Sequence, residues 1–173
     1  FQIAWLASVM GAAGQMPWLG PLAVLLALTL HFRRARQAFD EAILVLTCAA
    51  MGATFDSVLV AVGWVDYPAG LISQYFAPYW IITMWMLFAT TLNVSMRWLR
   101  GRPILAAVFG FYGGPTSYLA GQALGGIVLV NQFAALAMLA VGWAIMMPLL
   151  MCLSQMLDGR PGRPRHVSMA PSP

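Results

Sequence analysis

The chain has 173 residues, 61% of them apolar and only 8% charged, and its mean hydropathy is +0.80. A soluble domain carries about 25% charged residues, so this composition excludes a water-soluble protein and indicates that a membrane surrounds most of the chain. All nine basic residues are arginines. Because they are neither spread along a groove-filling helix nor interleaved with exposed aromatics, nucleic acid is not an expected partner.

Six apolar runs of about spanning length alternate with short polar connections. In chain order, the predicted spans cover residues 1–14, 17–32, 42–63, 78–99, 103–130 and 132–157. Pro17, Pro78 and Pro103 stand where helices are expected to begin, a position at which proline removes no needed hydrogen bond. The sequence therefore predicts an all-α transmembrane bundle of six spans over residues 1–157, followed by a polar, basic cytoplasmic tail over residues 158–173.

The arginines predict the orientation of these spans. They form three clusters, between spans two and three, between spans four and five, and after span six: Arg33, Arg34 and Arg36; Arg97, Arg100 and Arg102; and Arg160, Arg163 and Arg165. Arginine-rich connections mark the cytoplasmic side, so both termini are expected on the cytoplasmic side of a bacterial inner membrane. The other side gathers aromatic residues that are expected to form an interfacial belt: Trp18, Trp64, Tyr67, Tyr75, Tyr79 and Trp80.

Asp56 lies within the third predicted span. A carboxylate at membrane depth costs roughly 2.5–3.5 kcal/mol on insertion scales and usually faces the bundle interior. Residues at three- and four-residue spacing from it are mostly small, including Ala49, Gly52 and Ala53, which lets neighbouring helices approach closely. We therefore expect Asp56 to be buried and hydrogen-bonded to span four or five. Judged by depth along the helices, the expected partners are Thr83, Thr90, Ser117 and Tyr118.

Span four carries a polar seam at helical spacing, formed by Thr83, Met86, Thr90, Asn93 and Arg97. A face turned to lipid would not be polar at four of these five positions. Two interpretations stay open. The seam forms hydrogen bonds between helices, worth about 0.6 kcal/mol each, or Thr83, Thr90 and Asn93 bind a ligand.

Gly113, Gly114 and Pro115 lie in the middle of span five. Proline lacks an N–H and two glycines precede it, so the helix is expected to kink or unwind there. Broken helices at mid-depth build ligand sites in transporters, which makes these three residues and Ser117 candidate binding residues.

The glycines of span five also support a different interpretation. Gly110 and Gly114, and then Gly121 and Gly125, form small-xxx-small pairs, which let two helices pack closely without any ligand. The sequence does not decide between packing and binding.

No metal or cofactor is expected. Cys48 and Cys152 stand alone in apolar runs, and His31 and His166 lie on distant segments, so no pair has the spacing of metal ligands. His31 abuts an arginine cluster and is expected to be an interfacial residue. No nucleotide-binding or hydrolase motif occurs.

Several features occur in a characteristic order: Gln2 and Trp5, the Asp56-Ser57 pair followed by Gly63 and Tyr67, and the segments PYWIITMWMLFATTLNVSMRWL and GGPTSYLAGQALG. In these features the chain resembles a bacterial family of small polytopic inner-membrane proteins known only as a domain of unknown function, over about residues 1–155. Because that family has no established activity, the resemblance implies no catalytic roles. It implies only a loose context of lipid-modifying enzymes.

Three functions stay open at this point. The preferred one is a non-catalytic accessory or lipid-binding subunit of a larger membrane assembly, in contact with membrane lipids and with a membrane-protein partner or a second copy of itself, since this function needs no catalytic constellation. The second is an integral-membrane enzyme that modifies a lipid or polyene, with Asp56 as a buried general acid and Tyr118 nearby. The third is a small-molecule transporter built around residues 113–115.

Overall fold

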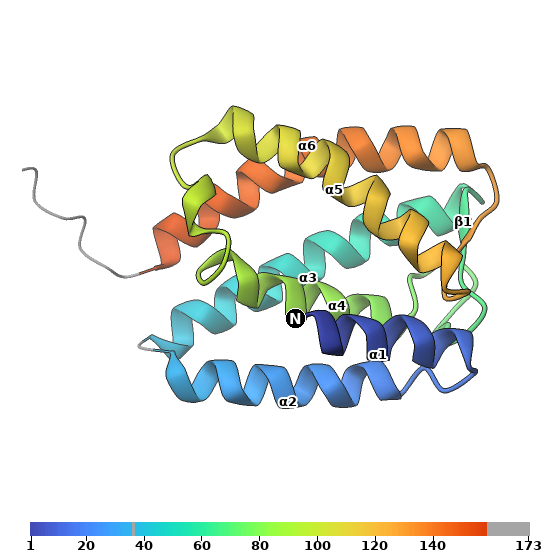
Figure 1. Cartoon of the computed structure of the whole chain (residues 1–173), viewed down its shortest axis with the longest axis horizontal. Coiled ribbons are helices and arrows are strands. Elements are labelled where there is room, and N and C mark those ends of the chain that lie inside the picture. Colours follow the sequence, from blue (N-terminus) through green and yellow to red (C-terminus); the bar gives the residue numbers. More distant parts are fainter. Residues whose placement is uncertain (36, 159–173) are drawn as a thin grey trace, which may run out of the picture.

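The computed structural model describes residues 1–35 and 37–158, which form six α-helices, a short 3₁₀-helix and a pair of two-residue strands (Figure 1). In chain order these are α1 (Gln2–Ala13), α2 (Leu19–Arg34), α3 (Ala38–Ala61), β1 (Val65–Asp66), α4 (Tyr79–Leu92), η1 (Arg97–Leu99), α5 (Pro103–Ala123), β2 (Val128–Leu129) and α6 (Gln132–Leu157). The all-α class and the predicted order of six helices are confirmed. Arg36 and the predicted tail from residue 159 onward lie outside the described residues.

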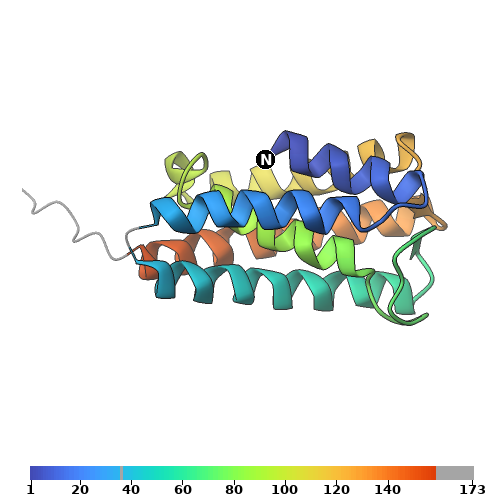
Figure 2. The same cartoon turned by 90° about the horizontal axis from the view of Figure 1, so that it is seen from below.

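The helices form two antiparallel hairpins with α3 and α4 between them. α1 packs on α2, α5 packs on α6, and α4 contacts both α1 and α2 on one side and α3 on the other, while α3 also packs on α6. Figures 1 and 2 show these helices running roughly along the long axis of the molecule. The core is apolar and rich in aromatic side chains, with Trp80, Tyr67 and Leu139 almost fully buried.

Helix α4 is shorter than the predicted span, which continued to Leu99. It ends at Leu92 because the carbonyl of Thr91 accepts the N–H groups of the next turn, including those of Ser95 and Met96. Its 14 residues rise about 21 Å, less than the roughly 30 Å of a hydrocarbon core. Residues 93–102 continue as turns and the short helix η1.

Helix α5 is continuous from Pro103 to Ala123 with Pro115 inside it, so the predicted unwinding at residues 113–115 is wrong. The glycine face of α5 packs along α6. A Cβ at Gly110 would lie 2.2 Å from the Trp143 carbonyl oxygen, and one at Gly114 would lie 2.4 Å from the Trp143 ring. This close packing holds the helix together although Pro115 removes one hydrogen bond.

The chain turns after α5 earlier than the predicted end at residue 130. Gly125 adopts a positive φ of 83°, and the N–H of Gly126 donates to the carbonyl of Gly121, which closes the helix as glycine commonly does. β2 then pairs antiparallel with β1. This small sheet joins the connection after α3 to the connection after α5.

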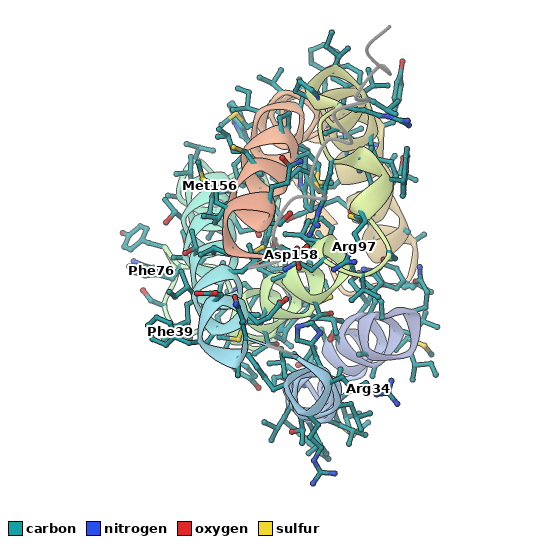
Figure 3. All side chains as sticks on the ribbon, turned by 90° about the vertical axis from the view of Figure 1, so that its left-hand side faces the viewer. Arg34, Phe39, Phe76, Arg97, Met156 and Asp158 are labelled. Carbon is teal, nitrogen blue, oxygen red and sulfur yellow. The ribbon has the colours of Figure 1, made fainter. Side chains whose placement is uncertain are left out.

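Two of the described helices, α3 and α6, are long and apolar enough to cross a membrane, and α1 and α4 are shorter apolar helices. The arginine-bearing connections of the described residues lie together at one end of the bundle, on the left in Figure 1. Figure 3 looks onto this end, where Arg34 and Arg97 are labelled. We call it the arginine end.

Candidate functional site: a buried carboxylate beside an apolar cavity

Asp56 lies in α3 with no exposed surface. Its Oδ2 accepts a hydrogen bond from Trp85 Nε1 of α4 at 2.7 Å. Its Oδ1 accepts one from the Tyr118 hydroxyl of α5 and one from the Tyr67 hydroxyl at 3.3 Å. The expectation of a buried Asp56 bonded to span four or five is therefore confirmed.

Gly52 brings Trp85 within reach of this carboxylate. It precedes Asp56 by one helical turn on the same face of α3. A Cβ at Gly52 would lie 1.9 Å from Trp85 Cδ2, so only glycine leaves room for the indole ring against the helix backbone. The ring consequently lies flat on α3 with its N–H directed at Asp56.

Three of the four expected partners of Asp56 do not contact it. The hydroxyls of Thr83, Thr90 and Ser117 instead donate to carbonyls three residues earlier in their own helices. Such local bonds satisfy Ser and Thr in apolar surroundings without any second helix. Two of the four polar residues in the seam of span four, Thr83 and Thr90, are thus satisfied within their own helix.

The structure adds Tyr67, which the sequence assigned to an aromatic belt. Tyr67 is 1% exposed and packs edge-on against Trp80 at a ring-centroid distance of 5.7 Å. Trp80 is also buried and donates to the carbonyl of Ala69. The belt prediction is wrong for these two residues, because β1 turns the loop inward over α3 and α4. Trp18 and Tyr75 are exposed.

A cavity of about 880 Å³ adjoins the carboxylate site, with walls from α1, α4, α5, α6 and the segment between α4 and α5. Trp85 and Trp143 form part of one wall, stacked with their ring centroids 4.7 Å apart, and Phe88 packs edge-on against both. The α5 wall repeats at helical spacing: Leu105, Val108, Phe109, Tyr112, Thr116 and Ala120. The walls among the described residues include no Asp, Glu or Arg.

Asp56 does not itself line the cavity, whereas two of its partners, Trp85 and Tyr118, do. Those two side chains separate the carboxylate from the cavity. The Tyr118 side chain bonds Asp56 through its hydroxyl and also lines the cavity. The geometry thus favours a structural role for Asp56, which holds two cavity-lining side chains in fixed positions.

The predicted ligand-binding residues divide between two places. Gly113, Gly114 and Ser117 line the cavity, and Pro115, Thr83 and Thr90 do not. Asn93 belongs to a separate polar cluster at the arginine end.

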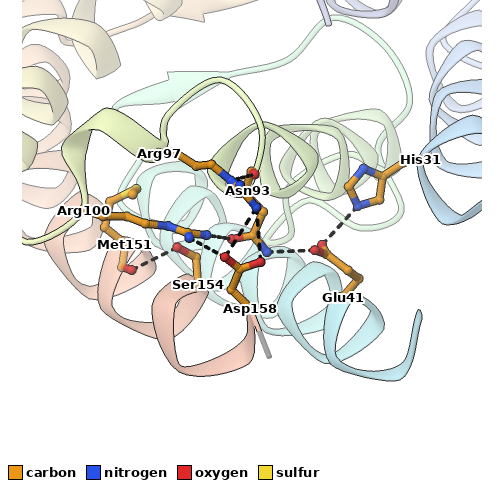
Figure 4. Close-up of polar contacts among 8 residues, drawn as sticks. All are labelled: His31, Glu41, Asn93, Arg97, Arg100, Met151, Ser154 and Asp158. Carbon is orange, nitrogen blue, oxygen red and sulfur yellow. Dashed lines mark hydrogen bonds and ion pairs between the residues drawn. The ribbon is translucent and has the colours of Figure 1, made fainter. Parts of the chain in front are cut away.

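That polar cluster joins five elements (Figure 4). Asn93 donates to Glu41 Oε1 at 2.8 Å, and His31 Nε2 lies 3.0 Å from Glu41 Oε2. Arg97 and Arg100 both form ion pairs with Asp158 at the end of α6, and Arg100 also donates to Asn93. His31, expected at the interface, is therefore also a member of this cluster. The sequence contains one indication of this cluster: Glu41, the single glutamate of the chain, lies on the same predicted side as the arginines.

No group of three or more His, Cys, Asp or Glu side chains within residues 1–35 and 37–158 could hold a metal ion. Cys48 is buried and Cys152 is exposed, and both are free thiols.

Comparison with protein families gives a match. A family described as "Protein of unknown function (DUF2878)" covers residues 1–149, a range that includes every residue of the carboxylate site and of the cavity walls. Neither the curated proteins nor the solved structures include a significant match.

Proposed function

Because the chain belongs to the DUF2878 family, whose function is unknown, we propose a function from the site itself. The protein is a multi-pass protein of the bacterial inner membrane that binds the apolar chain of a membrane lipid in the cavity between α1, α4 and α5. It acts as a non-catalytic lipid-binding subunit of a membrane assembly.

The multi-pass arrangement is supported by the charge distribution and the hairpins. Two helices are long and apolar enough to span, and the other four pack antiparallel against them or their neighbours. The described arginines lie on connections at one end of the bundle. With arginine marking the cytoplasm, an even number of crossings puts both termini of the chain on the cytoplasmic side.

The cavity is the observation that carries the lipid-binding proposal. Its volume of about 880 Å³ falls within the roughly 300–1,000 Å³ typical of ligand sites. From Leu105 to Ala120 the α5 wall of the cavity extends about 22 Å along the helix axis. Wall residues such as Tyr112 and Val108 are exposed, so the cavity is open at the side of the bundle. A long, apolar, laterally open cavity suits a chain that enters from the bilayer.

An enzyme that uses Asp56 as a general acid is the second candidate. The Tyr118 hydroxyl supports it, because this side chain bonds Asp56 and also lines the cavity. The separation of Asp56 from the cavity weighs against it. An altered lipid profile in a deletion strain that Asp56→Asn fails to restore would favour the enzyme. The transporter hypothesis loses its basis because α5 is continuous through residues 113–115.

Lipid entry is measurable with the four tryptophans that line the cavity, Trp5, Trp85, Trp98 and Trp143. The full chain in detergent is titrated with a phosphatidylcholine that carries brominated acyl chains, since bromine quenches tryptophan fluorescence on contact. We expect a saturable loss of fluorescence in addition to the gradual loss that exposed tryptophans show.

The variant Gly113→Leu tests the location of the chain. A Cβ at Gly113 meets only the Phe109 ring, at 3.9 Å, so a leucine side chain extends into open cavity space without a clash. We expect it to abolish the saturable quenching, while the matched variant Gly113→Ala keeps it. Saturable quenching that survives Gly113→Leu, or that is absent from the unaltered protein, contradicts the proposal.

A further inference from the structure

We infer that the bound lipid is an anionic glycerophospholipid from the leaflet at the arginine end, with one acyl chain in the cavity and its headgroup phosphate beside Arg102. This inference rests on the proposed function and specifies the class of lipid. Three observations support it: the cavity leads along α5 to Arg102, the charge of Arg102 is available at that end, and the two ends of the cavity differ in polarity.

The α5 wall of the cavity leads to Arg102. The wall residues Leu105, Val108, Phe109 and Tyr112 follow each other at three- and four-residue intervals, which defines one face of the helix. One turn before Leu105, the same face reaches Arg102, the residue that immediately precedes α5. A chain lying along this wall therefore ends next to the Arg102 position.

Arg102 is the arginine of this segment whose charge is available. Arg97 and Arg100 share the carboxylate of Asp158. Arg102 is exposed, and its side chain takes part in none of the ion pairs within residues 1–35 and 37–158. The first turn of α5 carries no acidic residue, so the local potential there favours an anion.

The two ends of the cavity differ in polarity. At the arginine end the walls include Ser95 and Trp98, both exposed, and Trp98 packs edge-on against Phe109 at 6.0 Å. A half-exposed tryptophan is typical of the headgroup level of a membrane. At the opposite end the walls include the buried apolar residues Val9 and Ile127. A charged headgroup fits the first end and not the second.

The test compares two lipids with the same brominated chains, phosphatidylglycerol and phosphatidylcholine, in the quenching titration of the full chain. We expect phosphatidylglycerol to bind about fivefold more tightly, the equivalent of the roughly 1 kcal/mol that one arginine near the surface contributes to anionic lipid binding. Arg102→Gln is expected to remove this difference by weakening the binding of phosphatidylglycerol more than that of phosphatidylcholine, whose phosphate is balanced by its own choline cation.

Arg33→Gln is the matched control. Arg33 is also an exposed arginine at the same end, in the last turn of α2, and α2 contributes no residue to the cavity walls. We expect this variant to keep the full preference for phosphatidylglycerol. Equal affinities for the two lipids in the unaltered protein, or equal effects of Arg102→Gln and Arg33→Gln, overturn the headgroup assignment while chain binding stands. Absence of saturable quenching by either lipid refutes the proposed function itself.

Discussion

Replacing Gly52 by alanine tests how the carboxylate site is built. The added Cβ would lie 1.9 Å from Trp85 Cδ2 and 2.1 Å from Cγ, distances that two carbon atoms not bonded to each other do not tolerate. Trp85 must therefore move off α3, and its 2.7 Å hydrogen bond to Asp56 is lost. The substitution is the smallest possible change that separates the two residues.

The expected cost combines three contributions. Overpacking costs about 1–3 kcal/mol. Leaving the buried Asp56 carboxylate without its hydrogen bond from Trp85 costs about a further 1–3 kcal/mol. Alanine gains about 1 kcal/mol over glycine in a helix interior. The net loss of stability is therefore about 3 kcal/mol, which corresponds to a fall in Tm of about 6–12 °C for a chain of this size.

Thermal unfolding in detergent, followed by tryptophan fluorescence, measures this loss. Gly113→Ala is the matched control, because Gly113 also lies inside a helix but its added Cβ would meet only one atom, at 3.9 Å. We expect the control to melt at the temperature of the unaltered protein or slightly above it. If Gly52→Ala melts together with Gly113→Ala, the packing of Trp85 on α3 is not as described.

Three further predictions use the same preparations. Tyr67→Phe removes the longest of the hydrogen bonds to Asp56 and should cost about 1 kcal/mol of stability in the same unfolding assay; an unchanged Tm would show that this bond contributes nothing. Asp158→Asn leaves two arginines without their ion-pair partner and should lower stability by about 1 kcal/mol or less, a loss that high salt should diminish. A cysteine at Gln74 should react with an impermeant maleimide added outside spheroplasts whereas one at Gln37 should not, and the reverse result would invert the proposed orientation.

Much of the fold was predictable because it depends on patterns that are local in the sequence. The apolar runs located all six helices, and the boundaries of α6 agree with the predicted span. The small-residue stripe around Asp56 correctly predicted its burial, since lipid exposure of a carboxylate is costly and small side chains admit neighbours. Tyr118 was correctly expected as a partner from depth alone.

The errors arose where tertiary packing decides between local alternatives. The sequence predicts that α5 kinks or unwinds at Pro115, but the helix does not unwind there, and Gly110 and Gly114 pack closely on Trp143 of α6. Tyr67 was assigned to the surface because aromatic residues in a loop usually lie at the interface. Its burial depends on the pairing of β1 with β2, which two-residue strands do not reveal in a sequence.

The cavity as a whole had no signature in the sequence, although Gly113, Gly114 and Ser117 of its α5 wall were candidates for ligand binding. Its walls come from helices that are distant in the chain. Its tryptophans do not indicate a cavity, because tryptophans also pack in cores that contain none. The partners within the polar cluster of Glu41, Asn93 and Asp158 were likewise not predictable, because its members lie at three separate helix ends. Only the fold brings these groups together.

Photo-crosslinking with a phosphatidylglycerol that carries a diazirine in one acyl chain tests the central claim most directly. Helix α5 offers an internal comparison, because Val108 and Tyr112 line the cavity whereas Ile104 and Phe111 do not, and all four side chains are exposed. Lipid binding in the cavity predicts that crosslinks mapped by mass spectrometry concentrate on the first pair and decrease when unlabelled lipid competes. Crosslinks distributed equally over both pairs, with no competition, would contradict it.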